Sequence, residues 1–168
     1  MRSRTKIVSL VLFLVMMISV FAGCGSAEDK EFSSNGFTVT LPGNAKEMDQ
    51  SLGYTVAYQI GNDIVVAAIE ETKSSLQSLG LAEDATVEEY AALVAEVNGY
   101  SADDIKKLTG TDAPYFEYSS TVSDVEYNYM GVCYESDESF WFVNLGTTAD
   151  KFDSVKEDFE RWAASVKV

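Results

Sequence analysis

The alternation of apolar and polar residues predicts β-strands in the first half of the chain. Residues 37–41 alternate phenylalanine, valine and leucine with threonine, as in a strand with one buried face. Asn35-Gly36 comes just before them and is typical of a two-residue hairpin turn, so residues 32–34 should be extended as well. Residues 54–60 alternate tyrosine, valine and isoleucine with smaller or polar residues in the same way.

Residues 64–69 are apolar at every position, which indicates a strand covered on both faces. This segment therefore predicts helices on both sides of a sheet. Further on, residues 114–121, 125–135 and 139–146 should form three strands, because short turn-like segments separate them. Together these three segments predict an antiparallel meander.

Two helices have clear sequence signals. Thr86 and Glu89 form a capping box, and apolar residues recur at helical spacing over residues 87–97. The last helix should begin near Thr148, since apolar residues recur every three or four positions over residues 152–166. That spacing predicts one apolar stripe along the helix.

Two shorter segments are less decisive. Residues 73–79 match a short helix. Residues 101–108 match a short capped helix, but residues 105–110 match equally well a strand that opens a hairpin into residues 112–119. The predicted fold class is α+β, with an antiparallel β-sheet flanked by helices.

The first 23 residues have the layout of a secretory signal. Residues 1–6 are basic, and residues 7–22 form an apolar run of 16 residues. That run is short for a bilayer span, which needs about 20 residues. A basic start, an apolar stretch and then small residues are typical of a removable signal.

The end of this run, Phe21-Ala22-Gly23-Cys24, resembles the lipobox of bacterial lipoproteins. In that family the cysteine receives a diacylglyceryl group and the chain is cleaved just before it. Phe21 departs from the leucine, valine or isoleucine that the family more often has. The alternative is an ordinary secreted protein, or an uncleaved anchor, in which Cys24 has no special role.

The resemblance divides the chain into a signal (1–23), a lipidated Cys24 with a short tether (24–31) and one domain (32–168). Two acyl chains on Cys24 would anchor the protein firmly, because each buried methylene adds about 0.8 kcal/mol. We therefore expect the protein on the outer, extracytoplasmic face of the cell membrane. The tether residues 25–31 reach about 25 Å at most.

Charge excludes nucleic acid as a partner. The chain has 12 basic and 27 acidic residues, and Arg2, Arg4 and Lys6 lie in the signal. Nine basic residues then remain against 27 acidic ones, which gives the rest of the chain a formal charge of −18. Binding to phosphates needs clustered lysine and arginine instead.

Catalytic groups are scarce. The chain has no histidine, which is the usual general base of serine and cysteine hydrolases and the commonest metal ligand. With Cys24 lipidated, Cys133 remains alone in an apolar stretch with acidic neighbours, which favours a buried, unreactive thiol. Adjacent carboxylates such as Glu70 and Glu71 are more typical of solvated turns and first helical turns than of a hydrolytic pair.

From residue 32 onward the chain resembles the PsbP/DcrB-like domains of bacterial lipoproteins. The matching segments, in order, are residues 36–42, 86–90, 108–113, 115–118, 140–143 and 152–166. The resemblance implies an α/β/α sandwich with an antiparallel sheet. Known members include a photosystem accessory subunit and other assembly or binding factors, and the family has no shared catalytic motif.

An aromatic band over residues 115–142 is the best candidate for a binding surface. Tyrosine and tryptophan are over-represented at binding hot spots, but the same residues could pack on both faces of the sheet beneath its helices. The strand register is open, so the sequence leaves undecided which rings share a face. The candidate surface residues are Tyr115, Tyr118, Tyr127, Tyr129 and Trp141.

We therefore expect a membrane-anchored, non-enzymatic binding or assembly module with a protein partner of unknown identity. We expect no enzyme, no cofactor and no resident metal. The alternative is a lipoprotein that binds a small ligand or a metal such as calcium, which prefers several carboxylate oxygens. The chain has no loop of EF-hand spacing.

Overall fold

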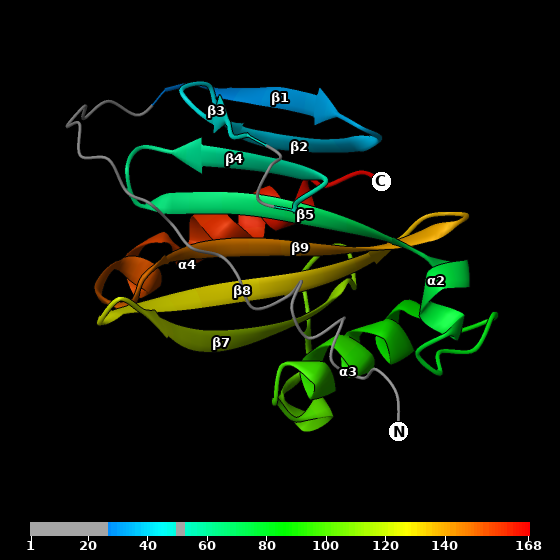
Figure 1. Cartoon of the computed structure of the whole chain (residues 1–168). Helices are drawn as coiled ribbons and strands as arrows, with labels where there is room; N and C mark the ends of the chain where they lie inside the picture. Colours follow the sequence, from blue (N-terminus) through cyan, green and yellow to red (C-terminus); the bar gives the residue numbers. More distant parts are fainter. Residues whose placement is uncertain (1–26, 50–52) are drawn as a thin grey trace.

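The computed structural model describes residues 27–49 and 53–168. It contains two antiparallel sheets and a few helices, which confirms the α+β fold class (Figure 1). The smaller sheet is the hairpin of β1 (Asp29–Ser34) and β2 (Phe37–Pro42). The larger sheet has the order β3-β4-β5-β9-β8-β7-β6. Its strands are β3 (Lys46–Glu47), β4 (Val56–Ile60), β5 (Ile64–Thr72), β6 (Lys106–Lys107), β7 (Pro114–Val122), β8 (Val125–Glu135) and β9 (Ser139–Thr148).

Tight turns set the register of the hairpins. Ser34 pairs with Phe37, so Asn35 and Gly36 form the two-residue turn, and both have positive φ as a type I′ turn requires. Strands β7, β8 and β9 form the expected antiparallel meander. Strand β9 then pairs with β5, which places the last strand of the chain in the middle of the sheet.

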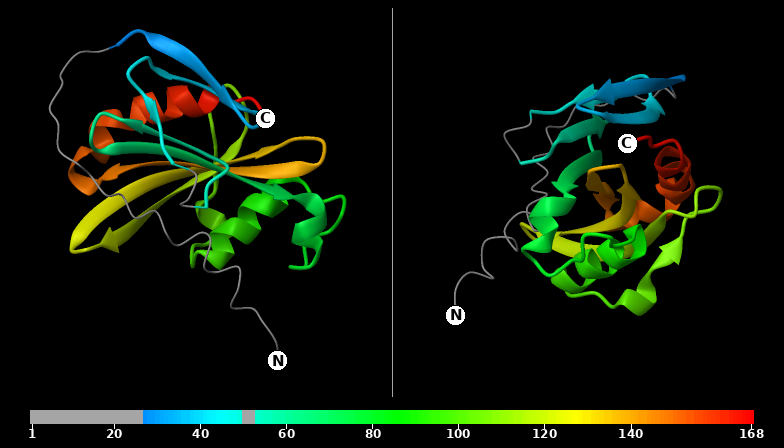
Figure 2. Two further views of the ribbon diagram at one scale, coloured as in Figure 1. Left: turned by 45° about the horizontal axis from the view of Figure 1, so that its top comes forward. Right: turned by 90° about the vertical axis from the view of Figure 1, so that its right-hand side faces the viewer.

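Helices lie on both sides of the larger sheet. Helix α4 (Ala149–Ala164) packs against β8, β9 and β2, whereas α3 (Val87–Val97) packs against β7 and β8. Figure 2 shows α4 and α3 on opposite sides, with the hairpin β1–β2 on the side of α4. The short helix α2 (Lys73–Gln77) follows β5 directly. The all-apolar segment of β5 is buried on both faces, as its sequence predicted.

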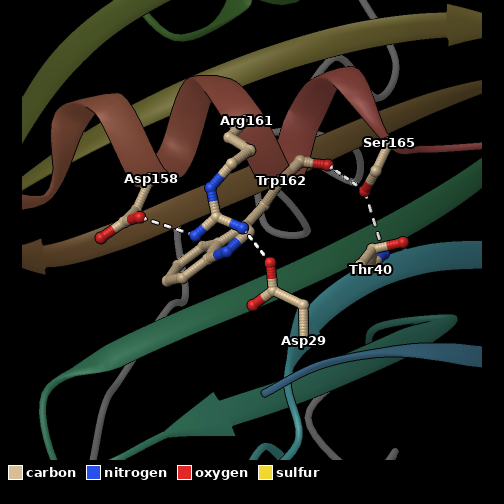
Figure 3. A network of polar contacts seen from close by, with 6 residues as sticks. All are labelled: Asp29, Thr40, Asp158, Arg161, Trp162 and Ser165. Carbon is tan, nitrogen blue, oxygen red and sulfur yellow. Dashed lines mark hydrogen bonds and ion pairs between the residues drawn. The ribbon is translucent and has the colours of Figure 1, made fainter. Parts of the chain in front are cut away.

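Polar contacts fasten α4 to the hairpin (Figure 3). The Ser165 hydroxyl accepts a hydrogen bond from the Thr40 backbone N–H at 2.9 Å and donates to the Trp162 carbonyl at 2.6 Å. The Arg161 guanidinium pairs with Asp29 and, at 2.7 Å, with Asp158. These contacts join the start of the domain to its last helix.

Two details differ from the sequence prediction or resolve it. Strand β1 begins at Asp29, three residues before the expected domain start, because Asp29 pairs with Pro42 in the hairpin. Residues 101–108 contain both predicted alternatives in turn, a 3-10 helix (Ala102–Asp104) and the short strand β6. The signal and Cys24 lie outside the described residues. Among the described residues, no helix combines the length and hydrophobicity needed to cross a bilayer.

Candidate functional site

The register divides the predicted aromatic surface between the two faces of the sheet. Tyr118 pairs with Tyr129, and side chains directly opposite each other on neighbouring strands share a face. Tyr127 lies two residues from Tyr129 and therefore points to the same side. Tyr115 and Trp141 lie on the other face, in the buried core beneath α4 and the hairpin. The structure thus brings together three of the five predicted residues.

Asn144 joins these three tyrosines on the same side of the sheet. Its partner on β8 is Gly131, which lies two residues from Tyr129. The Asn144 side-chain amide donates a hydrogen bond to the Tyr118 hydroxyl. We call the set Tyr118, Tyr127, Tyr129 and Asn144 the tyrosine face.

The rings of the tyrosine face are in contact with one another. Tyr118 stacks on Tyr129 with centroids 4.9 Å apart and an interplanar angle of 18°. The ring centroids of Tyr127 and Tyr129 are 6.4 Å apart, and those of Tyr100 and Tyr118 are 5.3 Å apart. The Tyr100 hydroxyl donates to the Ser119 carbonyl, which holds its ring beside β7. Tyr118 therefore contacts Tyr129 through its ring and Asn144 through its hydroxyl.

Gly131 makes room for this arrangement. A Cβ atom at Gly131 would lie 2.7 Å from two ring carbons of Phe142 and 3.4 Å from a ring carbon of Tyr118. Any larger residue would therefore push these rings away from the sheet. The glycine is needed because of the close approach of the rings, and it lets Tyr118 reach Asn144.

Two polar atoms of the tyrosine face are buried and have no hydrogen-bond partner among the residues that the structure describes. They are the Tyr129 hydroxyl and the Asn144 Oδ1, and their residues are only 2% and 7% exposed. Leaving a buried polar group unpaired costs about 1–3 kcal/mol. A buried polar group without a partner requires an explanation. One explanation is a ligand that forms the missing hydrogen bond.

The hydroxyls of Tyr118 and Tyr129 are neutral at physiological pH. Burial raises the pKa of Tyr54 to about 12, and it raises the pKa values of Tyr118 and Tyr129 as well. The tyrosines act on one another in the same direction. The tyrosine face therefore offers hydrogen bonds and ring surfaces rather than charge.

The sequence also drew attention to Cys133, to adjacent carboxylates and to possible metal ligands. Cys133 is fully buried under α3, and burial raises the pKa of its thiol, which makes it unreactive. Glu71 accepts a hydrogen bond from the buried Tyr90 hydroxyl at 2.6 Å. Within residues 27–49 and 53–168, no group of three or more cysteine, aspartate or glutamate side chains is arranged to hold a metal ion.

An acidic hollow of about 790 Å³ lies at the turn between β8 and β9. Lys73 there pairs with Glu135 at 2.6 Å, and the Ser139 hydroxyl donates to Glu70 at 2.8 Å. Its lining residues are Glu70, Thr72, Lys73, Glu135, Ser136, Asp137, Glu138, Ser139 and Val168. The side chains of Lys73, Glu135, Ser139 and Glu70 therefore already have polar partners within the protein.

Sequence reasoning missed Asn144, although a signal for it existed. Asn144 is the only amide in the otherwise apolar and aromatic middle of the 139–146 segment. A lone amide in a strand covered on both faces predicts a buried polar group with a specific partner. A second signal concerns Tyr115 and Tyr118, which are three residues apart in one predicted strand. Residues an odd number apart in a strand point to opposite faces, so these two tyrosines had to lie on different faces of the sheet.

Comparison with known proteins shows likeness in structure rather than in sequence. No protein-family model matches the chain, and no curated protein matches it. Cyanobacterial PsbP (CyanoP) from Synechocystis sp. PCC 6803 is similar in structure, with a TM-score of 0.48 and 18% identity over 89% of this chain and 98% of that one. A PsbP protein is therefore among the structural neighbours of this chain.

A second solved structure, from Bacteroides thetaiotaomicron VPI-5482, has a TM-score of 0.53 and 14% identity over 86% of this chain. This chain spans 49% of that protein's length. The likeness shows a shared fold and concerns the fold alone.

Proposed function

We propose that this protein is a lipoprotein, held on the outer face of the cell membrane through Cys24, that works as a non-enzymatic binding or assembly module. Its domain would then be a PsbP-like domain, as the sequence resemblance implies. The tyrosine face is its binding site. The observation that carries this proposal is the pair of buried, unpartnered polar atoms on Tyr129 and Asn144 among stacked rings.

The side chains present support binding rather than catalysis. Small-molecule sites are typically lined by apolar and aromatic side chains with a few well-placed polar groups. The Tyr118 and Tyr129 hydroxyls stay protonated because burial raises their pKa values, so they are not available to act as bases. The chain has no histidine, and the thiol of Cys133 is buried in the core.

A pair of photo-crosslinking positions tests this function in cells. Ser120 is exposed on β7, across from Tyr127 and on the side of the tyrosine face, whereas Ser154 is exposed on α4 behind the sheet. A photo-reactive phenylalanine derivative would replace each serine in turn in the full-length protein. Mass spectrometry would identify what each variant captures.

We expect a captured species from position 120 that is absent from position 154. The Tyr129→Phe variant, which removes only the unpartnered hydroxyl, should reduce this capture. Equal capture from both positions, or capture that survives Tyr129→Phe, would contradict binding at the tyrosine face.

A further inference from the structure

The β1–β2 hairpin holds the chain almost directly after Cys24. Asp29 pairs with Pro42, and the backbone N–H of Gly43 donates a hydrogen bond to the Glu28 carbonyl at 2.8 Å. A Cβ atom at position 43 would lie 2.9 Å from the same carbonyl oxygen, so the glycine permits this close contact. The hairpin pairing therefore extends back to residue 28, and only residues 25–27 separate it from Cys24.

This connection is shorter than the domain is wide. Four peptide units join the Cα atom of Cys24 to that of Glu28, and they span about 14 Å at most. A compact domain of about 140 residues has a radius of gyration of about 14 Å, so its opposite sides lie roughly 35 Å apart. An anchor on Cys24 can therefore hold the hairpin at a membrane but cannot bring the opposite side of the domain there.

That opposite side contains helix α3. Figures 1 and 2 show the hairpin at one extreme of the molecule and α3 at the other. The tyrosine face is on the same side of the larger sheet as α3, because Asn144 lies two residues from Phe142 in β9, and Phe142 packs with residues of α3. The surface nearest to Cys24 and the tyrosine face are thus on different sides of the sheet.

Charge favours the same orientation. Residues 83–107, which include α3, contain seven acidic and two basic residues, whereas residues 28–47 contain four acidic and two basic ones. Each acidic residue of β1, Asp29 and Glu31, also forms an ion pair with a basic residue near the end of the chain. A bilayer with anionic lipid repels excess negative charge within a Debye length, which is about 8 Å at physiological ionic strength. The hairpin side therefore meets less repulsion there than the side of α3.

We propose, on the basis of the Cys24 anchor proposed above, that the β1–β2 hairpin lies against the membrane surface. Its outward side chains include Ser33 and Thr38, whose hydroxyls are hydrogen-bonded at 2.9 Å, so it meets the polar headgroups rather than the acyl chains. The tyrosine face then points away from the bilayer. Its partner approaches from the aqueous side and is not a membrane lipid.

Two labelled positions measure this orientation. Ser33 on β1 and Ser120 on β7 are both exposed strand serines, one on the hairpin and one on the side of the tyrosine face. Ser33→Cys and Ser120→Cys would each be made in the full chain, purified in its lipidated form and labelled with a thiol-reactive fluorophore. Cys133 is buried and should not react. The vesicles would contain phosphatidylcholine and phosphatidylglycerol, with nitroxide on some headgroups to quench nearby fluorophores.

We expect the label at position 33 to lose most of its fluorescence on nitroxide vesicles, whereas the label at position 120 keeps most of its fluorescence. Equal quenching at both positions, weak quenching at both, or stronger quenching at position 120 would overturn the orientation for protein that floats with the vesicles. The anchor would stand in those cases. Protein that fails to float with the vesicles would refute the anchor and the orientation together. Lipid captured by the photo-crosslinker at position 120 would also overturn the orientation.

Discussion

Single buried polar atoms in this protein affect its stability and, under the proposed function, its binding. The Tyr129 hydroxyl and the Thr147 hydroxyl are each buried in the larger sheet, and neither has a hydrogen-bond partner within residues 27–49 and 53–168. They lie on opposite faces of that sheet, and only Tyr129 belongs to the tyrosine face. Each costs desolvation energy in the free protein. If the cost at Tyr129 is retained for a ligand, the two residues should respond differently to substitution.

The Tyr129→Phe and Thr147→Val variants should both be more stable than the wild type by about 1 kcal/mol, because each removes an unpaired buried hydroxyl and keeps the side-chain shape. Urea unfolding followed by tryptophan fluorescence would measure this difference. Only Tyr129→Phe should also lose binding. A loss of more than 1 kcal/mol in either variant would show that its hydroxyl has a partner in solution.

Helix α4 shows how a local pattern determines packing. Its residues Phe152, Phe159 and Trp162 are buried against the sheet, as the spacing of apolar positions predicted. Tyr134 adds a hydrogen bond of 2.7 Å to the Ala163 carbonyl. The helix is therefore held along one stripe by rings and by a few polar contacts near its end.

Replacing Trp162 with alanine should destabilise the domain by about 3–5 kcal/mol, because the indole is 3% exposed and packs against Phe159. Thermal or urea unfolding of the two proteins gives this number. Glu157→Ala is a suitable control, since Glu157 is exposed on the same helix. A change below about 1 kcal/mol for Trp162→Ala would mean that this helix face is not packed in solution.

The contacts of Figure 3 should differ in strength. Ser165→Ala leaves the Thr40 N–H without its acceptor, so we expect a loss of about 1–2 kcal/mol. Arg161→Met removes ion pairs whose side chains are half exposed, and such pairs contribute about 0–1 kcal/mol. Urea unfolding of both variants tests this order. A larger effect for Arg161→Met would mean that the ion pairs, rather than the serine bridge, hold the hairpin.

The helices, hairpin turns and meander could be predicted because their signals are local. The capping box at Thr86 and the turn at Asn35-Gly36 both formed as their residues indicated. The division of the aromatic band could not be read from hydropathy, because strands covered on both faces are apolar at successive positions. The contact between Tyr118 and Asn144 depends on the pairing of β7, β8 and β9, which only the register supplies.

At the scale of the whole molecule, Glu117 connects elements that are far apart in the sequence. It accepts hydrogen bonds from Lys156 on α4 at 2.8 Å and from Lys106 on β6 at 3.3 Å. Burial acts to raise the pKa of Glu117, but the two lysines together lower it below its ordinary value of 4.5. Folding therefore favours the charged form of this carboxyl group.

The pH dependence of stability follows from that sign. A carboxyl whose pKa is lower in the folded state stabilises the protein above its unfolded pKa, and this is lost as pH falls through the folded value. Glu117→Gln should therefore be less stable than the wild type at pH 7, by up to about 1 kcal/mol, because the group is partly exposed. The two unfolding curves should converge in acid. A difference that persists at pH 2 would indicate a packing effect instead.

The proposed lipid anchor would determine where the whole molecule works, and Cys24 is the residue that would carry it. Two acyl chains bury many methylenes at about 0.8 kcal/mol each, so a diacylated chain should stay with the membrane. Cys24→Ala should therefore release the protein from the membrane fraction or leave it unprocessed. Flotation of membranes, with mass spectrometry of the amino terminus, distinguishes these two outcomes.

The second cysteine provides the control for this experiment. Cys133 is buried in the core, so Cys133→Ala should lower stability but leave the protein membrane-bound. If Cys24→Ala still matures and floats with lipid, the lipobox interpretation is wrong. The binding site proposed on the tyrosine face would then belong to a secreted protein.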